Sequence, residues 1–138
     1  MIRLVRKRQQ GAALLVAIFV LAISLLLVLA FMDSAALESQ AASYSLHYVQ
    51  ARYVAEAGAE DAIATYRQDP SAVIPYLIRT EFPAGSGHYY EHQMLPTASN
   101  PGGRTITATG TVAGISRTVT AEVELIGTRI LVRRWEEL

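Results

Sequence analysis

Residues 11–32 read GAALLVAIFVLAISLLLVLAFM, an apolar run that determines how the rest of the chain is organised. After Gly11, twenty-one consecutive residues carry no formal charge, and Ser24 is the only hydroxyl among them. As a helix they would extend about 32 Å, enough to cross a hydrocarbon core of about 30 Å. A helix also satisfies its own backbone hydrogen bonds, as lipid requires. The run therefore predicts a membrane-spanning helix over residues 12–32.

A short basic leader, residues 1–11, precedes this run. Four of its residues are basic: Arg3, Arg6, Lys7 and Arg8. Basic residues beside a span stay in the cytoplasm, so we expect the N-terminus there and everything after Asp33 outside. A cleaved secretory signal would have an apolar run of about 7–15 residues, so a cut near residues 34–36 is disfavoured. The chain is therefore expected to be a single-pass protein of the inner (cytoplasmic) membrane.

The composition of the 138 residues bounds the function. Twelve basic residues balance twelve acidic ones, but four of the basic ones lie in the leader. The exported part then holds eight basic and twelve acidic residues. Its net charge of −4 argues against contact with nucleic acid. The chain has no cysteine, which excludes disulfides, a thiol nucleophile and cysteine-bound zinc. About a hundred residues follow the span, enough for one small domain.

The helical pattern continues beyond the membrane over residues 33–68. This segment contains no proline, a single glycine, and many good helix formers. Asp69-Pro70 ends it, because the residue before proline avoids the helical conformation. Residues spaced alternately four and three positions apart form a stripe along one face of this helix. In the second half of the segment the side chains of the stripe are small, so a sheet can approach the helix closely there. The members of the stripe are Leu37, Ala41, Tyr44, Tyr48, Ala51, Ala55, Gly58, Ala62 and Thr65.

Residues 69–138 read as a small antiparallel sheet. Thr105–Val112 and Thr118–Leu125 alternate between polar and apolar residues, as half-buried strands do, with a turn over residues 113–116. Residues 89–95 and 129–135 are candidates for further strands, giving a meander of three or four. Residues 70–86 are predicted as a connection, in which Ile74, Tyr76 and Ile78 form a short strand or pack down, and residues 96–103 as a loop. The predicted fold is α+β, with the long N-terminal helix packed against a β-meander.

The segment RKRQQGAALLVAIFVLAISLLLVLA, residues 6–30, resembles the N-terminus of type IV pilin-like precursors, in particular PilX-type minor pilins. The helical segment YVAEAGAEDA, residues 53–62, resembles one common in these pilin-like proteins. The threonine-rich hairpin also fits this family, though less specifically. The resemblance covers the full length of the chain.

This resemblance implies processing followed by assembly. Prepilin peptidase would cut after Gly11 and methylate the new amine of Ala12. The apolar helix would then leave the bilayer lipid and pack with other major and minor pilins, driven by an assembly ATPase and an inner-membrane platform. The product would be a filament in the periplasm or at the cell surface.

One position departs from the pattern of the family. Most major pilins carry glutamate at the fifth residue after the cut, where this chain has Val16. Most also begin the mature chain with phenylalanine, where this chain has Ala12. A carboxylate inside a membrane helix costs about 2.5–3.5 kcal/mol on insertion scales, so it is kept only for a purpose. A chain without it fits a minor subunit, at the priming end or the tip.

Sequence motifs for enzymatic chemistry are weak. His88, Glu91 and His92 match the H-x-x-E-H zinc pattern, which requires a helix. Their context is that of a strand or loop, so exposed strand histidines are expected instead. The tyrosines of the exported helix are expected to pack on the sheet or on a neighbouring helix. Its carboxylates are expected to be solvated. These residues are Tyr44, Tyr48, Tyr53, Glu38, Glu56, Glu60 and Asp61. We expect no enzyme activity, metal or cofactor.

Three functions remain open on these grounds. The first is a minor pilin of a type IV pilus-like filament. A pseudopilin of a type II secretion system would share every feature described above. An uncleaved single-pass membrane protein with an exported binding domain is the third, and processing after Gly11 separates it from the other two.

Overall fold

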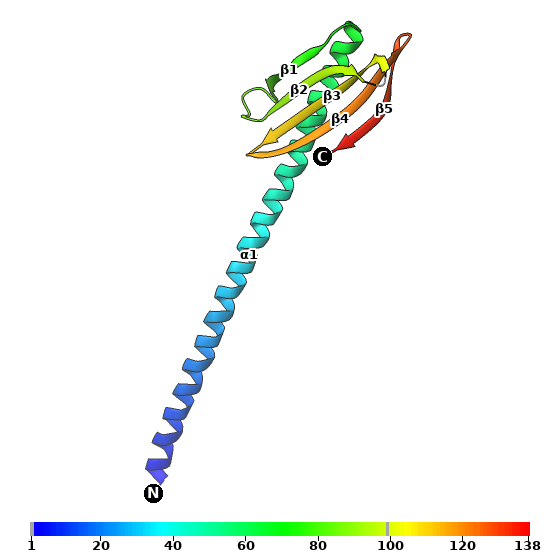
Figure 1. The fold of residues 1–138 in the computed structure, drawn as a ribbon. Helices are drawn as coiled ribbons and strands as arrows, with labels where there is room; N and C mark the ends of the chain where they lie inside the picture. Colours follow the sequence, from blue (N-terminus) through cyan, green and yellow to red (C-terminus); the bar gives the residue numbers. More distant parts are fainter. Residues whose placement is uncertain (1, 99) are drawn as a thin grey trace. The chain divides into compact units, whose positions relative to one another are not determined.

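The computed structural model describes residues 2–98 and 100–138 and confirms the α+β prediction. One long helix is followed by a five-stranded antiparallel meander in the order β1-β2-β3-β4-β5 (Figure 1). The elements are α1 (Ile2–Gln68), β1 (Ile74–Glu81), β2 (Tyr89–Thr97), β3 (Asn100–Val112), β4 (Ile115–Ile126) and β5 (Arg129–Glu137). The chain divides into two compact units, residues 1–43 and 44–138.

Helix α1 ends where the sequence predicts. Asp69 donates its backbone N–H to the Thr65 carbonyl at 2.9 Å, and Pro70 follows. The Asp69 carboxylate then accepts hydrogen bonds from the Ser71 hydroxyl and backbone N–H, which lower the pKa of Asp69. The helix begins at Ile2 rather than at residue 12, so the leader also has a helical backbone.

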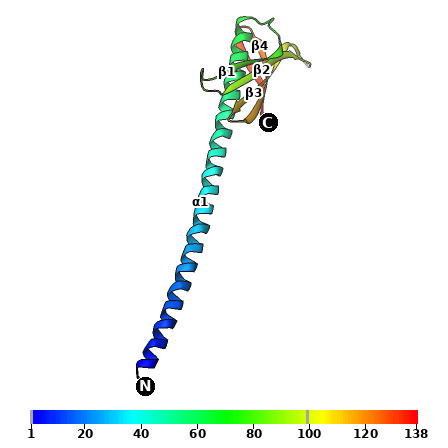
Figure 2. The ribbon, with the colours of Figure 1, turned by 90° about the vertical axis from the view of Figure 1, so that its left-hand side faces the viewer.

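The second half of α1 covers one face of the sheet (Figure 2). Its small residues Ala51, Ala55 and Ala62 are fully buried, as the stripe predicts. Gly58 allows a very close approach, because a Cβ there would lie 2.8 Å from Cδ2 of Tyr90. On β3, a Cβ at Gly110 would collide with the backbone of Ala51 and Ala55. Glycine is therefore required on both sides of the contact between helix and sheet.

The register of β4 is also as predicted. Val119, Ala121 and Val123 are at most 1% exposed and pack beneath the helix, whereas Thr120 lies on the opposite face. The hairpin turn before β4 is shorter than predicted, because Ile115 already pairs with Val112. Ala113 and Gly114 make the turn with φ angles of 48° and 80°, as a two-residue hairpin turn requires.

Two other sequence predictions are wrong. The sheet has five strands rather than three or four, because Ile74–Glu81 form strand β1, which is the short-strand alternative for Ile74, Tyr76 and Ile78. Residues 96–103 are mostly strand rather than loop. Pro96 pairs with Arg104, and an irregularity in the register beside it accommodates the proline. Gly103 is buried, and a Cβ added to it would lie only 3.3 Å from the Thr97 hydroxyl oxygen. This glycine therefore marks a close approach of β3 to β2.

We predict that Val123→Asp lowers the free energy of unfolding by several kcal/mol, because it buries a charge without a partner. Thr120→Asp, on the polar face of the same strand, is the matched control and should have little effect. Thermal unfolding of the full chain in detergent, followed by fluorescence of Trp135, measures both variants. Equal losses in the two variants would show that the assigned faces of β4 are reversed.

Candidate functional site

The N-terminal half of α1 carries an uncovered apolar surface. Every described residue from Gly11 to Leu46 is exposed, including Leu15 at 70% and Phe31 at 81%. Exposed apolar patches on soluble monomers rarely exceed a few hundred Å², so a longer one indicates an interaction with protein or lipid. The helix is long and apolar enough to cross a membrane, by length and composition. The structure therefore supports the coarse prediction of a membrane-spanning segment.

The predicted processing site lies at the start of this surface. Gly11 has a helical backbone, and a Cβ added there would meet no atom within 4 Å. The glycine is therefore not required by packing within the chain. Glycine is about 1 kcal/mol worse than alanine in a helix, so it weakens α1 at this point. A glycine here therefore makes local unwinding of the helix easier than an alanine would.

Val16 lies on the same exposed surface, with 63% of its area accessible. No side chain of the chain itself dictates a valine at this position, since Gly11 to Leu46 is exposed throughout. The three predicted site residues, Gly11, Ala12 and Val16, thus lie together within little more than one helical turn. All three are exposed.

The H-x-x-E-H motif does not form a metal site. Strand alternation separates its residues: His92 faces α1 and is 2% exposed, while Glu91 faces away and forms an ion pair with Arg79 at 2.7 Å. His88 precedes β2. Within residues 2–98 and 100–138, no group of three His, Cys, Asp or Glu side chains could hold a metal ion. The prediction that these histidines are exposed is wrong for His92.

A polar cluster forms between α1 and β2, and sequence reasoning missed it. His92 and Tyr90 are buried there, whereas the Asp61 side chain is 49% exposed, as predicted for a solvated carboxylate. Nδ1 of His92 is buried without a hydrogen-bond partner among the described residues and lies 4.0 Å from Oδ2 of Asp61. Tyr90 donates its hydroxyl to the same oxygen at 3.1 Å. Burial lowers the pKa of His92, and the Asp61 carboxylate opposes part of that effect. One signal in the sequence could have predicted this. Tyr90, His92 and Met94 are two positions apart along β2, so all three lie on the face of the strand that packs against α1.

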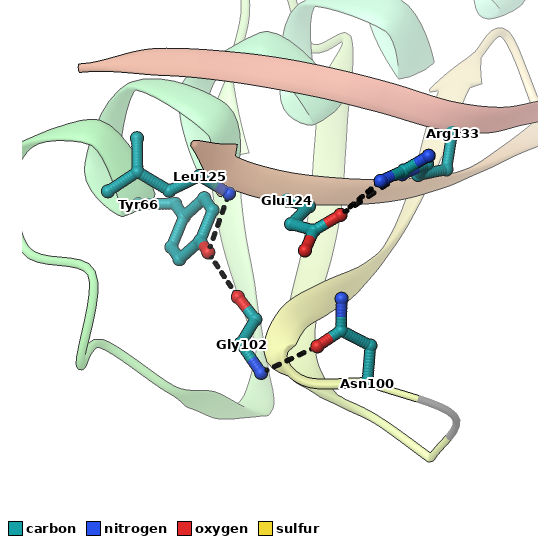
Figure 3. Close-up of polar contacts among 6 residues, drawn as sticks. All are labelled: Tyr66, Asn100, Gly102, Glu124, Leu125 and Arg133. Carbon is teal, nitrogen blue, oxygen red and sulfur yellow. Dashed lines mark hydrogen bonds and ion pairs between the residues drawn. The ribbon is translucent and has the colours of Figure 1, made fainter. Parts of the chain in front are cut away.

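The end of α1 is fixed to the sheet by polar contacts that serve the fold. The Tyr66 hydroxyl donates to the Gly102 carbonyl at 2.6 Å and accepts from the Leu125 N–H at 3.2 Å. Figure 3 draws these contacts as dashed lines. Arg104, only 7% exposed, donates to the carbonyls of Pro70 and Ala72. These bonds satisfy polar groups that burial would otherwise leave unpaired.

Glu124 lies beside this network on the outer face. Its carboxylate forms an ion pair with Arg133 at 2.8 Å (Figure 3). A hydrogen bond from Asn100 and the contact with Arg133 lower the pKa of Glu124. The pair is solvent-exposed on its arginine side and fits a structural role.

The other candidate residues on α1 have ordinary surroundings. Glu38 and Glu60 are exposed, as predicted for a solvated face, and Glu56 pairs with Arg52 at 3.0 Å. Tyr48 contacts the sheet through the Arg117 guanidinium, 4.3 Å from the centre of its ring. Tyr44 and Tyr53 are 66% and 64% exposed, so neither covers the sheet, and the predicted alternative of contact with a neighbouring helix stays a prediction.

Comparison of the chain with family models, with curated proteins and with solved structures finds no match.

We predict that acidification destabilises the sheet unit through His92. The pKa of His92 is lowered in the folded state, so the unfolded chain binds the proton more tightly. The stabilisation from neutral His92 is complete above the unfolded pKa of about 6.5 and is lost as the pH falls from there toward the folded value. Trp135 fluorescence during urea unfolding at several pH values measures the effect. His92→Phe should remove this part of the pH dependence, and an unchanged profile in that variant would exclude His92 as its source.

Proposed function

We propose that the chain is a minor subunit of a type IV pilin-like filament, made as a precursor and processed after Gly11. One observation supports this most strongly: an uncharged, fully exposed helical surface begins directly at the residue after a basic leader ending in glycine. In this proposal the chain is structural and has no catalytic role. Its partners are prepilin peptidase, the other pilins and the assembly platform of the inner membrane.

The same helical surface suits both stages of such a life cycle. In the bilayer, residues 12–32 contact lipid tails, and the basic leader holds the N-terminus in the cytoplasm. In a filament, the same side chains pack against other apolar helices. Both environments reward burial of apolar area, at about 25 cal/mol per Å², so one surface serves both.

The position of Val16 favours a minor subunit over a major one. A glutamate there would direct an incoming chain to the amine of its predecessor, through an attraction that is strong in surroundings of low dielectric. Val16 offers apolar contact only, which is non-directional and permits sliding. Its own amine at Ala12 remains able to receive a carboxylate from a neighbour. Such a chain suits the start of a filament or a preformed complex of minor subunits.

A pseudopilin of a type II secretion system remains an alternative, because the same features fit it equally. An uncleaved membrane protein with an exported binding domain is a different class, and the processing experiment below separates it.

Coexpression with prepilin peptidase should yield a chain that begins at methylated Ala12, as measured by intact mass. Gly11→Leu should abolish cleavage. Because a side chain at Gly11 meets no neighbour, this loss would report recognition by the peptidase rather than misfolding. Ala22→Leu makes a similar change of size on the same exposed helix and should leave cleavage intact. Retention of residues 1–11 beside an active peptidase would reject the pilin assignment.

The minor role predicts few copies per filament. Quantitative mass spectrometry of sheared filaments should find this chain far below the most abundant pilin, and deletion of its gene should reduce the number of filaments. If this chain were itself the most abundant pilin, the inference from Val16 would be wrong, although the assignment to the family would survive.

A further inference from the structure

Among the described residues, Nδ1 of His92 is the one buried side-chain polar atom without a hydrogen-bond partner. The Asp61 carboxylate lies 4.0 Å away and is already engaged, because its Oδ2 accepts the Tyr90 hydroxyl at 3.1 Å. A protonated imidazole here would be a buried charge without a close hydrogen bond, which is costly. The closed sheet therefore favours the neutral form of His92.

The groups packed around His92 offer it no second counter-ion within the described part of the chain. On its own strand, burial raises the pKa of the Tyr90 hydroxyl, which stays protonated and neutral. Across the sheet, His92 pairs with Ile78 on β1 and Ala108 on β3, both apolar. Asp61 of α1 is thus the charge that acts on the imidazole, and burial still lowers the pKa of His92.

The two charged residues of β1 are engaged elsewhere. Arg79 forms an ion pair at 2.7 Å with Glu91, which faces away from α1. The Glu81 carboxylate accepts the Gly87 N–H at 2.6 Å. Strand β1 therefore brings no charge to His92.

Strand β1 is the thinnest cover of His92. It forms an edge of the sheet next to β2 (Figure 1), and six of its eight residues are exposed. Ile74 is the one described residue of this strand that packs against the apolar core. Ile74 pairs with Met94 and Ile78 with His92, so three residues of β1 stand opposite Gln93 alone. A strand with an irregular ladder and few buried contacts opens locally at low free energy.

We propose that β1 is an acid-released edge strand, which separates from β2 as His92 takes up a proton. Separation brings water to the imidazolium, so the open state binds the proton that the closed state resists. Arg104 holds the carbonyls of Pro70 and Ala72, so the opening begins after Ala72. On the exported side of the membrane, where the proposed function puts this unit, the outside pH would then set how often the β2 edge is bared.

Proton linkage sets the expected size of the effect. In the open state the pKa of His92 returns to about 6.5, whereas burial lowers it in the closed state. The stabilisation of the closed state is therefore complete above about pH 6.5 and is lost as the pH falls below that value. Between about pH 7.5 and about pH 5, the open population should rise by up to about thirtyfold.

Hydrogen exchange of the full chain in phospholipid nanodiscs, followed by mass spectrometry and corrected for the intrinsic effect of pH, measures the opening. Between about pH 7.5 and about pH 5, amide protection in β1 should fall by about tenfold or more, while β3 and β4 keep theirs. His92→Phe should abolish this response. His88→Phe, which removes a half-buried histidine just before β2, is the matched control and should retain it.

Asp61→Asn should enlarge the acid response, because it removes the charge that favours the imidazolium in the closed state. A purely structural role of the cluster would not produce that change. His92→Gln, which is also neutral at every pH, takes the place of His92→Phe should the latter fail to fold.

Unchanged protection of β1 on acidification would overturn the proposal, as would an acid response that persists in both His92 variants. Equal losses of protection in β1, β3 and β4 would indicate global unfolding instead of a released edge, and would overturn it too. Neither state of β1 depends on processing, so retention of residues 1–11 would leave these results unaffected.

Discussion

The close approach of α1 to the sheet is the contact on which the rest of the folded unit depends. Gly58 lies directly over the ring of Tyr90, and Gly110 lies against the backbone of Ala51. Neither position has room for a Cβ, so the helix and the sheet share a contact nearer to backbone packing than to interdigitated side chains. Close packing of this kind removes small side chains from water with little loss of side-chain entropy. It also explains why a stripe of alanines suffices to hold a long helix.

That contact fixes which polar groups become buried. With the helix so close, Tyr66 in the last turn of α1 is buried and bonds to the Gly102 carbonyl of the sheet. Arg104 of β3 is buried as well and bonds to the carbonyls of Pro70 and Ala72, which follow the helix. His92 is buried by the same approach, but its Nδ1 gains only a distant carboxylate. The unit thus satisfies its polar groups at the end of the helix and leaves one titratable group poorly satisfied in the middle.

The sequence predicts the elements whose patterns are local. The small stripe of α1 and the alternation of β3 and β4 predict both buried faces, because periods of 3.6 and 2 are read directly from residue order. The prediction of a loop over residues 96–103 is wrong for a non-local reason. Proline and glycine usually mark loops, but here Pro96 sits at an irregular point of pairing and Gly103 at a close approach of strands, and both depend on β3 being next to β2 and β4. The side of His92 was likewise set by its strand neighbours rather than by its motif.

Two kinds of surface on one helix have different determinants. At Gly58 the residue type follows from the neighbouring ring, so folding alone explains it. At Gly11 and Val16 the chain provides no neighbour that would select a residue, since the helix is exposed from Gly11 to Leu46. Propensity argues against a glycine within a helix, and lipid alone would accept any apolar residue at position 16. The folded chain alone therefore does not explain the identities of these residues; in the proposed function they follow from cleavage after Gly11 and from packing against other apolar helices.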